Sequence, residues 1–457
     1  MIIINFISRY IFFVYSLYRL NLQQTDSNIN YVKETANRCG PIAIKLLQFI
    51  IMSAPDLIKT TKLNFVFEEN FVHKIECTEK MYLKDFKRDI NQYYTNLEVV
   101  GSGSLGQVYR AFCKTTNQLV AIKVKHPGIN ENVNKSVLAI KIVCFILRPI
   151  NRFHSIFMEY INNIYLQIDY IQEAKNTTQL KYNFKNESVV VIPEIYYYSS
   201  NFIIMSYHEA KNFNQVDENT QNIASMYLNF IYLTSLIVHD FLHADLHYGN
   251  WKVIEGRDPY DIKILIYDCG IMCTTGNKSL NIQIIDNITK GKPNIINLLD
   301  VFKTVDPVLQ KKVDKYRPEI EKYMKPIFYD DSIHGSECIN IFLRKLVDLR
   351  LITNKNLINI LTSVSIIGEA PTRSIHIFIK YIINPIGTNS LLYHVYIDIL
   401  AKMNKFNELR LFYIEHLKRD PENKRIYDNW LYEEFGHKKG YILTDIIYHL
   451  FFPKVKF

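Results

Sequence analysis

Glycine is concentrated in one short segment of the chain, Gly101-Ser102-Gly103-Ser104-Leu105-Gly106-Gln107-Val108. A residue without a Cβ lets the backbone pass close to a bound group, so that its N–H groups can contact phosphate oxygens. Taken alone, the G-x-G-x-x-G-x-V spacing also fits a plain turn, or a dinucleotide-binding fold in which the third glycine opens a helix. Here a β-prone run follows that glycine, which favours a phosphate-covering loop between two strands. The residues expected to contact such a ligand are Gly101, Gly103, Gly106 and Val108.

A lysine follows this segment by about the length of one hairpin, in Val120-Ala121-Ile122-Lys123. A strand lysine at that point can reach the α- and β-phosphates of a nucleotide. It would need a carboxylate partner from a helix, and the candidates are Glu173, which we prefer, and Glu159. By itself the tetrapeptide fits an ordinary edge strand with a solvated lysine, so its significance depends on the neighbouring motifs.

Two later segments carry carboxylates. In His243–Asn250, which is H-A-D-L-H-Y-G-N, Asp245 can orient or deprotonate a hydroxyl, and the amide oxygen of Asn250 can hold a metal ion. In Asp268-Cys269-Gly270, the aspartate ends an apolar run and can bind the Mg²⁺ that bridges phosphates. Each motif is weak alone, but four in this order and spacing are hard to obtain by chance.

Hydrophobic periodicity supplies the elements that must position these residues. The sequence predicts helix over 23–60, with Gly40-Pro41 opening its second part, and again over 132–184 and 219–240. The apolar stripe of the 132–184 helix consists of Phe157, Ile161, Ile164, Ile168 and Ile171. Strands are expected at 97–100, 107–112, 119–125, 189–192, 202–205, 251–254 and 262–267, with a turn at 115–117 and mainly helix over 275–457. This order indicates an α+β, protein-kinase-like fold of two lobes.

The expected organisation has four parts. They are an apolar N-terminal segment at 1–22, a helical extension at 23–93, a β-rich N-lobe at 94–210 and a larger helical C-lobe at 211–457. Residues 1–20 are mostly apolar or aromatic, but polar residues interrupt the run. A membrane span needs about 20 apolar residues. We therefore expect an amphipathic or partly buried helix, with membrane association through this end as an alternative.

Composition narrows the class of protein. With 457 residues, 48% of them apolar and 22% charged, the chain can bury a large core, which excludes general disorder. The net charge of +9 suits a phosphate-bearing ligand or an anionic membrane surface, and no Lys/Arg block indicates nucleic-acid binding. Its seven scattered cysteines include one close pair, Cys269 and Cys273, and show no zinc-site pattern, which favours an intracellular, reducing compartment.

Segments between these motifs resemble the UbiB family, the aarF-domain atypical kinases. The helix at 40–48 looks like that family's K-x-G-Q helix, and 167–176 is similar to its E-x-D-x-x-x-E-A-x-N helix. His243–Asn250 is close to the family's H-A-D-P-H-P-G-N loop, and the resemblance covers about residues 30–275. It implies Mg-ATP as cofactor and a link to isoprenoid-lipid metabolism, with Lys45, Gln48 and Asp169 as accessory motif residues.

Three positions depart from the family pattern. An Ala-rich loop is usual where this chain has Gly101-Ser102-Gly103, and the glycines should accommodate nucleotide more easily. Leu47 replaces the glycine of K-x-G-Q, and Gln167 replaces the first acid of E-x-D. The resemblance implies that these two elements fold over the site and restrict protein substrates, a restriction that the replacements place in doubt.

The sequence thus predicts an Mg-ATP-dependent phosphotransferase or ATPase whose acceptor, protein or otherwise, it does not name. Asp245 would be the base, Lys123 would pair with phosphates, and Asn250 and Asp268 would hold Mg²⁺. One alternative is a nucleotide-binding pseudokinase that regulates a membrane assembly, and another is a small-molecule phosphotransferase of the aminoglycoside or choline kinase type. The alternation of His243, Asp245 and His247 also fits a metal hydrolase, a weaker interpretation beside the other motifs.

Overall fold

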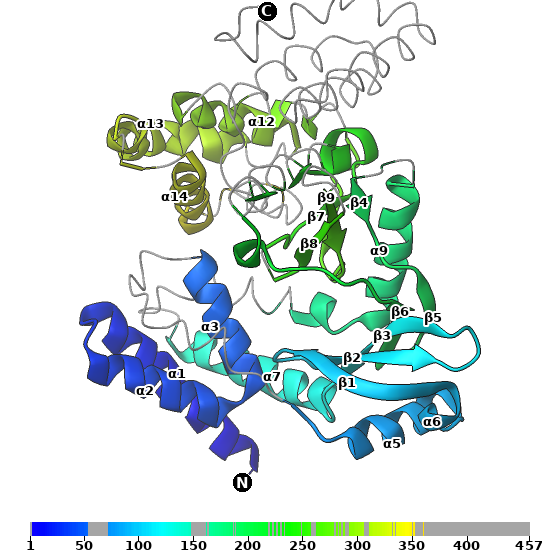
Figure 1. The fold of residues 1–457 in the computed structure, drawn as a ribbon. Helices are drawn as coiled ribbons and strands as arrows, with labels where there is room; N and C mark the ends of the chain where they lie inside the picture. The colour runs from blue at the N-terminus through cyan, green and yellow to red at the C-terminus, as the bar shows by residue number, and fades with distance from the viewer. Residues whose placement is uncertain are drawn as a thin grey trace, which may run out of the picture. The chain divides into compact units, whose positions relative to one another are not determined.

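The computed structural model describes residues 2–53, 72–147 and, with short gaps, 161–360. The chain divides into two compact units (Figure 1). Unit 1 comprises 1–185, 192–209 and 267–271, and unit 2 comprises 186–191, 210–266 and 272–457. The helix predicted beyond residue 360, and the last part of the helix predicted over 23–60, lie outside the described residues.

The core of unit 1 is a five-stranded antiparallel sheet with the strand order β1-β2-β3-β6-β5. Its strands are β1 (Tyr94–Ser102), β2 (Gly106–Cys113), β3 (Gln118–Lys125), β5 (Ile195–Tyr198) and β6 (Phe202–Ser206). The three strands predicted around the glycine-rich segment are confirmed; β1 is more than twice as long as expected, and β2 and β3 are longer by one or two residues. The turn at 115–117 is also confirmed: Asn117 has a φ of 54° and its N–H donates to the Cys113 carbonyl at 2.8 Å.

Strand β5 was not predicted. Its three tyrosines, Tyr196 to Tyr198, are all exposed on an edge strand, so the sequence lacks the alternation of buried and exposed residues that marks a half-buried strand. Pairing with β6, rather than a buried face of its own, is what makes this segment a strand.

Unit 1 carries seven described helices. They are α1 (Ile2–Leu22), α2 (Asp26–Cys39), α3 (Pro41–Ser53), α5 (Ile75–Phe86), α6 (Ile90–Tyr93), α7 (Ile129–Leu147) and α9 (Tyr170–Asn183). The predicted break between α2 and α3 is confirmed: Gly40, at a φ of 92°, ends α2, and Pro41 begins α3. α1 packs against α2 and α7, and α3 also packs against both, so the four form a helical layer with its own apolar core.

The helical stretch predicted over 132–184 is confirmed in its described residues, but the helix is not continuous. Asp169 interrupts it and caps α9, because its carboxylate accepts the Gln172 N–H at 3.0 Å and its backbone leaves helical geometry. The apolar stripe breaks there too: Ile161 and Ile164 are buried, but Ile171 is exposed. Phe157 and Glu159 lie outside the described residues.

Helix α1 carries large apolar or aromatic side chains on both its buried and its exposed side. Tyr10, Phe13, Leu17 and Leu20 are fully buried against the helical layer. The large apolar or aromatic side chains exposed on α1 are Ile11, Phe12, Tyr15, Tyr18 and Leu22, and Arg9 and Arg19 are exposed as well. Of the helices that the structure describes, none has the length and apolar character needed to cross a membrane.

The described part of unit 2 contains two small sheets. Strands β4 (Val190–Val191), β9 (Ile262–Ile266) and β8 (Trp251–Glu255) form one, with β9 in the centre, and β7 (Leu242–His243) pairs with β10 (Met272–Cys273) in the other. The strand pair predicted at 251–254 and 262–267 is confirmed. The C-terminal half of β9 consists of Ile264, Leu265 and Ile266, and all three are buried. A strand that is covered on both faces has such an unbroken apolar run.

The helices of unit 2 begin with a 3-10 turn at Phe213–Gln215 and a π-helix at Thr234–His239. A second 3-10 helix at Lys292–Asn297 leads into α12 (Leu298–Val305), α13 (Gln310–Phe328) and α14 (Gly335–Asp348). Within the described residues after 275, the predicted helical character is therefore confirmed.

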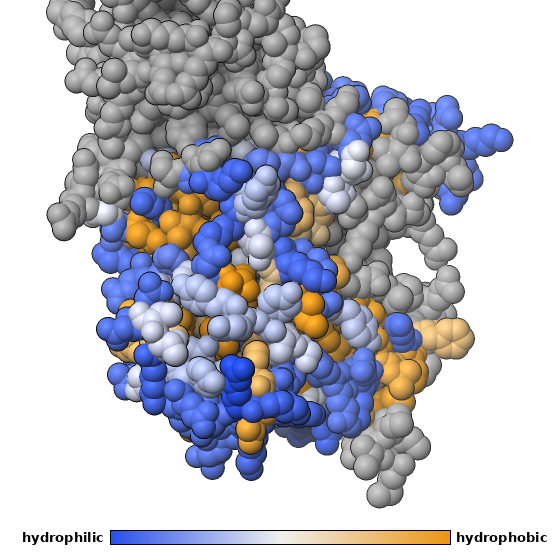
Figure 2. Space-filling view, turned by 90° about the vertical axis from the view of Figure 1, so that its right-hand side faces the viewer, coloured by the Kyte–Doolittle hydropathy of each residue, from blue (hydrophilic) through white to orange (hydrophobic). Residues whose placement is uncertain are grey.

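The outer surface is of mixed polarity. On the face drawn in Figure 2, hydrophilic residues predominate and the hydrophobic residues form separate patches. Large apolar side chains at the surface of a folded protein are common when they are scattered, so this mixture alone indicates no particular partner.

Replacing Leu47 with glycine, the residue usual in the resembling family, should destabilise the chain strongly. Leu47 is fully buried in the helical layer, and glycine in a helix adds a backbone cost. We expect a loss of about 3–5 kcal/mol in the free energy of unfolding, measured by urea denaturation. Leu47→Met keeps the side-chain volume and should lose less than about 1.5 kcal/mol. Equal stability of the glycine variant and the parent would contradict this packing.

Candidate active site

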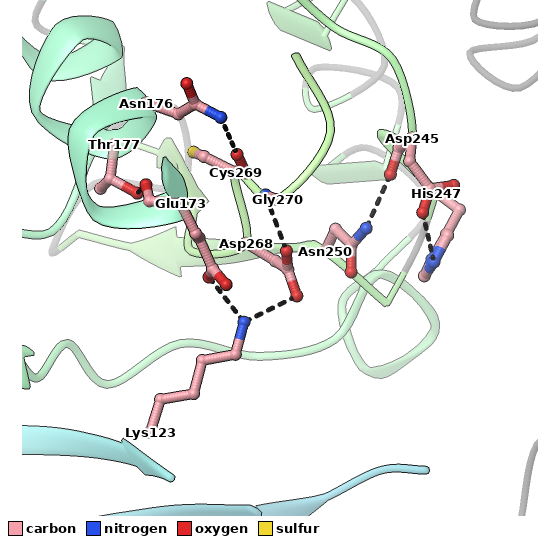
Figure 3. Close-up of polar contacts among 10 residues, drawn as sticks. All are labelled: Lys123, Glu173, Asn176, Thr177, Asp245, His247, Asn250, Asp268, Cys269 and Gly270. Atoms are coloured by element: carbon pink, nitrogen blue, oxygen red, sulfur yellow. Dashed lines mark hydrogen bonds and ion pairs between the residues drawn. The ribbon is translucent and has the colours of Figure 1, made fainter. Parts of the chain in front are cut away.

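Lys123 of β3 lies between two carboxylates in unit 1 (Figure 3). Its Nζ is 2.6 Å from Glu173 Oε1 and 3.1 Å from Asp268 Oδ2. The Glu173 side chain is 2% exposed and the Lys123 side chain 15%, whereas the Asp268 side chain is 36% exposed. The three residues are distant in sequence, and the fold brings together a buried base, a buried acid and a second acid that solvent can reach.

Burial and charge act against each other at this pair. Burial by itself would lower the pKa of Lys123, but the carboxylates of Asp268 and Glu173 outweigh it and raise that pKa well above its ordinary value. Burial raises the pKa of Glu173, which the Lys123 ammonium opposes. The lysine is therefore held firmly as a cation, ready to pair with phosphate.

Helix α9 places the acid and also fixes the loop that holds Asp268. Glu173 and Asn176 lie three residues apart, on one side of the helix. Asn176 Nδ2 donates to the Cys269 carbonyl at 2.9 Å, and the Gly270 N–H donates to Asp268 Oδ1 at 3.2 Å. Thr177 Oγ1 adds a bond to the Glu173 carbonyl at 2.8 Å (Figure 3). One helix thus positions both partners of Lys123.

The glycine-rich loop joins β1 and β2, as the sequence predicts. A Cβ added to Gly106 would lie 2.4 Å from the Val124 carbonyl oxygen and 2.6 Å from the Tyr170 hydroxyl, so packing within the protein requires this glycine. A Cβ added to Gly101 or Gly103 would meet no atom within 4 Å. Nothing in the described protein excludes a side chain there, and the open space is of the kind a bound phosphate group would fill.

An apolar cluster lies beside Lys123. Ala121, Tyr170, Ile203 and Met205 are buried together, and Val108 packs against them half-buried. The Lys123 and Lys125 ammonium groups lie 5.1 and 5.0 Å from the centre of the Tyr170 ring. These cation–π contacts fix the ring between the two lysines. Such a surface suits the flat, apolar face of a nucleotide base.

In unit 2, the loop after β7 has a hydrogen-bonded shape of its own. The Asp245 carbonyl accepts from Asn250 Nδ2 at 2.7 Å (Figure 3). It also accepts from the His247 N–H at 3.0 Å, while the Asp245 N–H donates to His243 Nδ1 at 3.1 Å. Because the Asn250 amide nitrogen is engaged by a carbonyl, its oxygen faces the other way and is the atom suited to a metal ion. The Asp245 carboxylate is partly exposed and lies 3.9 Å from His247 Nε2.

The residues fit a magnesium–nucleotide complex better than a protein-only metal site. Among the described residues, no group of three or more His, Cys, Asp or Glu side chains is arranged to hold a metal ion. Mg²⁺ is commonly bound by one or two protein oxygens together with phosphates and water. Within unit 1, Asp268 could supply a protein oxygen, and the positions at Gly101 and Gly103 are open to a phosphate group. Within unit 2, the Asn250 amide oxygen is a separate candidate ligand.

The accessory motif residues behave differently from one another. The i, i+4 spacing of Asp169 and Glu173 would place both on one helix face. In the structure they do not share one, because Asp169 precedes the helix as its cap and is exposed. Lys45 is half-buried on α3, and the Gln48 side chain lies outside the described residues. Gln167 lies near Gly270, and its buried amide oxygen has no hydrogen-bond partner among the described residues.

Sequence reasoning assigned no role to Asn176 or Tyr170. Asn176 restrains the loop after Asp268, and Tyr170 contacts both lysines. The spacing of Asn176 from Glu173 was a signal that could have identified it. The position of Tyr170 depends on how the start of α9 packs against β3, which the sequence does not reveal.

Two glycine substitutions should separate packing from ligand contact. Gly106→Ala should lower the free energy of unfolding by about 1–3 kcal/mol, because its Cβ would overlap backbone and a buried hydroxyl. Gly101→Ala should leave stability within about 0.5 kcal/mol of the parent and act only on ligand affinity. Thermal unfolding of both variants without ligand measures this difference, and equal destabilisation would contradict the loop geometry.

Comparison with known proteins identifies the family. Residues 70–290 match the family model of the ABC1 atypical kinase-like domain. An aarF domain-containing protein kinase of Arabidopsis thaliana chloroplasts, itself uncharacterised, is 25% identical over 244 residues, which cover 51% of this chain and 34% of the relative. AarF domain-containing kinase 1 of Drosophila melanogaster is 26% identical over 294 residues, covering 57% of this chain and 55% of the relative.

This chain thus spans about a third to about half of the length of these two relatives. A solved structure of Rv3197 with erythromycin, from Mycobacterium tuberculosis, covers 57% of this chain and 67% of its own at 14% identity and a TM-score of 0.42, too low to carry an argument. The family match, the five-stranded sheet with its glycine-rich loop, and the Lys123–Glu173 pair confirm the predicted α+β kinase-like fold. Residues 70–290 of this chain belong to the ABC1, or aarF-domain, family of atypical kinase-like proteins.

Proposed function

We propose that this chain binds Mg-ATP and transfers the terminal phosphoryl group to an acceptor or to water. The observation that carries the proposal is the position of Lys123, whose ammonium group lies within hydrogen-bonding distance of both Glu173 and Asp268. Kinase-like sites use a strand lysine, a helix acid and a metal-binding aspartate in this combination.

The bound nucleotide would supply the phosphoryl group, and Mg²⁺ would neutralise the charge that develops on it. Lys123 would bind the phosphates, with Glu173 holding its ammonium in place. Asp268 would exchange its contact with Lys123 for the metal ion, since its carboxylate is the more exposed of the two acids. Backbone N–H groups of the glycine-rich loop would bind the remaining phosphate oxygens.

In unit 2, Asp245 would accept the proton of the attacking hydroxyl, and the Asn250 oxygen would bind metal. The Asn250 amide is oriented for this by its bond to the Asp245 backbone carbonyl, so the metal ligand is held against the backbone of the residue that carries the base. A general base must lie within hydrogen-bond reach of the proton that it removes. Because hydrogen bonds within the loop after β7 fix its backbone, the loop can have its final shape before a substrate binds.

Two alternatives remain as outcomes of the experiment below. A pseudokinase would bind nucleotide without turnover, and the acidic residues at 245 and 268 argue against it. A small-molecule phosphotransferase would use the same loop with a different acceptor. The acceptor class is open, and protein, lipid and water are all compatible with a partly exposed Asp245 carboxylate.

Turnover of ATP by the purified chain with Mg²⁺ tests the proposal, with Asp245→Asn and Asp268→Asn as variants. Asp245→Asn should reduce turnover by about 10²–10⁴-fold but leave nucleotide binding near the parent value, because only proton transfer is lost. Asp268→Asn should weaken Mg²⁺-dependent binding by more than about tenfold. Substituting a residue that only hydrogen-bonds to a metal ligand already lowers metal affinity by about 10- to 100-fold, and loss of a ligand itself should cost at least as much.

Asp300→Asn, an exposed substitution on α12, is the matched control and should change neither quantity. Binding without turnover under every condition would replace the enzyme with the pseudokinase. Unchanged Mg²⁺-dependent binding by Asp268→Asn would show that this residue does not hold the metal.

We further propose that the exposed face of α1 contacts a membrane surface. Five neighbouring large apolar or aromatic side chains on one helix face are exposed, and a helix of this kind can lie in the interface of a bilayer. The net charge of +9 would favour anionic lipid. Isoprenoid lipid as a partner rests on the family resemblance alone.

Flotation of the protein with anionic vesicles measures this contact. Phe12→Ser should lower the partition coefficient by about tenfold or more, because burying an aromatic side chain is worth about 1.5–3 kcal/mol. Leu83→Ser, at an exposed leucine of α5, is the control and should bind like the parent. Parent-like flotation of Phe12→Ser would contradict the assignment to α1.

A further inference from the structure

A chain of hydrogen bonds connects the glycine-rich loop to α5 through two histidines that the proposed reaction does not use. His126, directly after β3, places Nε2 at 2.7 Å from the Gly103 carbonyl oxygen. Its Nδ1 is 2.8 Å from His73 Nδ1, and His73 Nε2 is 2.8 Å from Thr78 Oγ1. Thr78 Oγ1 is in turn 3.0 Å from the Tyr109 hydroxyl.

The direction of each bond follows from its acceptors. A carbonyl only accepts, so His126 Nε2 carries hydrogen. In a neutral ring, His126 Nδ1 is then the acceptor, and His73 Nδ1 must donate to it. His73 Nε2 accepts from the Thr78 hydroxyl, and Thr78 accepts from Tyr109. Every contact then has one donor and one acceptor, with both imidazoles uncharged.

Gln107 prevents the chain from reversing. Its Oε1 accepts the His73 N–H at 2.9 Å, and its Nε2 donates to the His73 carbonyl at 3.2 Å, which fixes the orientation of its amide. The same Nε2 donates to the Tyr109 hydroxyl oxygen. A proton on His126 Nδ1 would force every bond of the chain to reverse. Thr78 would then donate to the Tyr109 hydroxyl, which already accepts from Gln107, and the hydroxyl hydrogen of Tyr109 would have lost Thr78 as its acceptor. Thr78 and Tyr109 are buried, so that loss would be costly.

His126 also controls the shape of the glycine-rich loop through its backbone. Its N–H donates to the Leu105 carbonyl at 3.0 Å, so two loop carbonyls, those of Gly103 and Leu105, point to this one residue. In a trans peptide the C=O and the following N–H point in opposite directions. The N–H groups of Ser104 and Gly106 therefore face away from His126. Amides directed in this manner are what a phosphate-binding loop must offer.

Burial favours the uncharged form of both rings. It lowers the pKa of His73 to about 4, with a smaller contribution from His126, and it lowers the pKa of His126. The ordinary value is about 6.5. The stabilisation that the pair provides is thus complete above about pH 6.5 and is lost as the pH falls towards about 4. The other titratable groups around the chain are Tyr109, Lys125 beside His126, and Cys77 and Glu79 of α5, whose charges act on Tyr109.

We propose that the His73–His126 pair is a positioning device that holds the glycine-rich loop in the conformation that accepts nucleotide phosphates, and that it operates only while both imidazoles are uncharged. The nucleotide part of this inference rests on the proposed function. The loop geometry does not, and it can be measured without nucleotide.

Amide hydrogen exchange of residues 101–106 tests whether the His73–His126 pair holds the loop, and we call this restraint the latch. The exchange is measured in the full chain, without nucleotide, and corrected for intrinsic rates. A glutamine at 126 can place its amide nitrogen where His126 Nε2 lies and donate to Gly103, whereas asparagine is too short. His126→Asn should speed loop exchange by about two- to tenfold, the value of one hydrogen bond, and His126→Gln should largely restore protection. His208→Asn, at a histidine bonded to Ser206, is the control and should match the parent.

The pH dependence supplies the second readout. Between pH 6.5 and 4, loop protection should fall in the parent but not in His126→Gln, whose amide does not titrate. Mg-ATP affinity, measured as the ratio of parent to His126→Gln so that protonation of ATP itself cancels, should fall about severalfold over the same interval.

Equal loop exchange in the parent and His126→Asn would overturn the latch. Faster exchange throughout unit 1, instead of at 101–106, would also overturn it, because His126 would then support the whole sheet. Faster loop exchange in His126→Asn with no Mg-ATP binding by the parent would uphold the latch and overturn the proposed function. A pH-independent affinity ratio would overturn the requirement for uncharged rings.

Discussion

The ion pair between Lys123 and Glu173 is the constraint on which unit 1 depends. Two opposite charges are removed from water almost completely, and loss of one partner from such a pair typically costs about 3–5 kcal/mol because the other charge is left buried. The pair joins the third strand of the sheet to α9, so the sheet cannot slide relative to that helix without breaking it. A hydrophobic pair could hold the same elements together, but it could not present a cation to phosphate.

Helix α9 converts this single contact into a site. Its N-terminus is set by Asp169, its first turn carries Glu173, and its next turn carries Asn176, which holds the loop after Asp268. A shift of the cap by one residue would rotate both side chains away from their partners, since each residue turns the helix by about 100°. The cap is therefore a positional device as much as a stabilising one, and the local chemistry of an exposed aspartate determines the register of a buried acid.

Sequence reasoning succeeded where local rules dominate. Alternating and β-prone residues identified the strands around Gly101 to Lys123, and Gly40-Pro41 identified a helix boundary, because each feature depends on neighbours in the chain. The family and the fold class could likewise be predicted from motif order. The edge strand β5 could not be, because pairing with β6 creates it, and the break before α9 was missed because a hydrophobic stripe continued past its cap.

The site was only partly visible for the same reason. Glu173 could be preferred over Glu159 from motif spacing, but the contact of His73 with His126 joins residues whose rings meet only when α5 packs beside β2 and β3. Tyr170, the first residue of α9, lies between two lysines of β3 because the helix packs against that strand, and Gly106 is required by the Val124 carbonyl and not by a ligand. Such contacts carry no local sequence signal.

The division of the chain into units has a consequence for synthesis on the ribosome. Unit 1 is not continuous: it includes residues 267–271, which follow β8 and β9 of unit 2. Lys123 and Glu173 emerge early, but Asp268 emerges only after both of those strands have been made. A nascent chain stalled before that point would hold a lysine with one carboxylate where the finished protein has two. In unit 1, Lys123 can therefore meet its second carboxylate only after residue 268 has been made. Because unit 1 consists of three separate segments of the chain, no single cleavage of the backbone can release it intact.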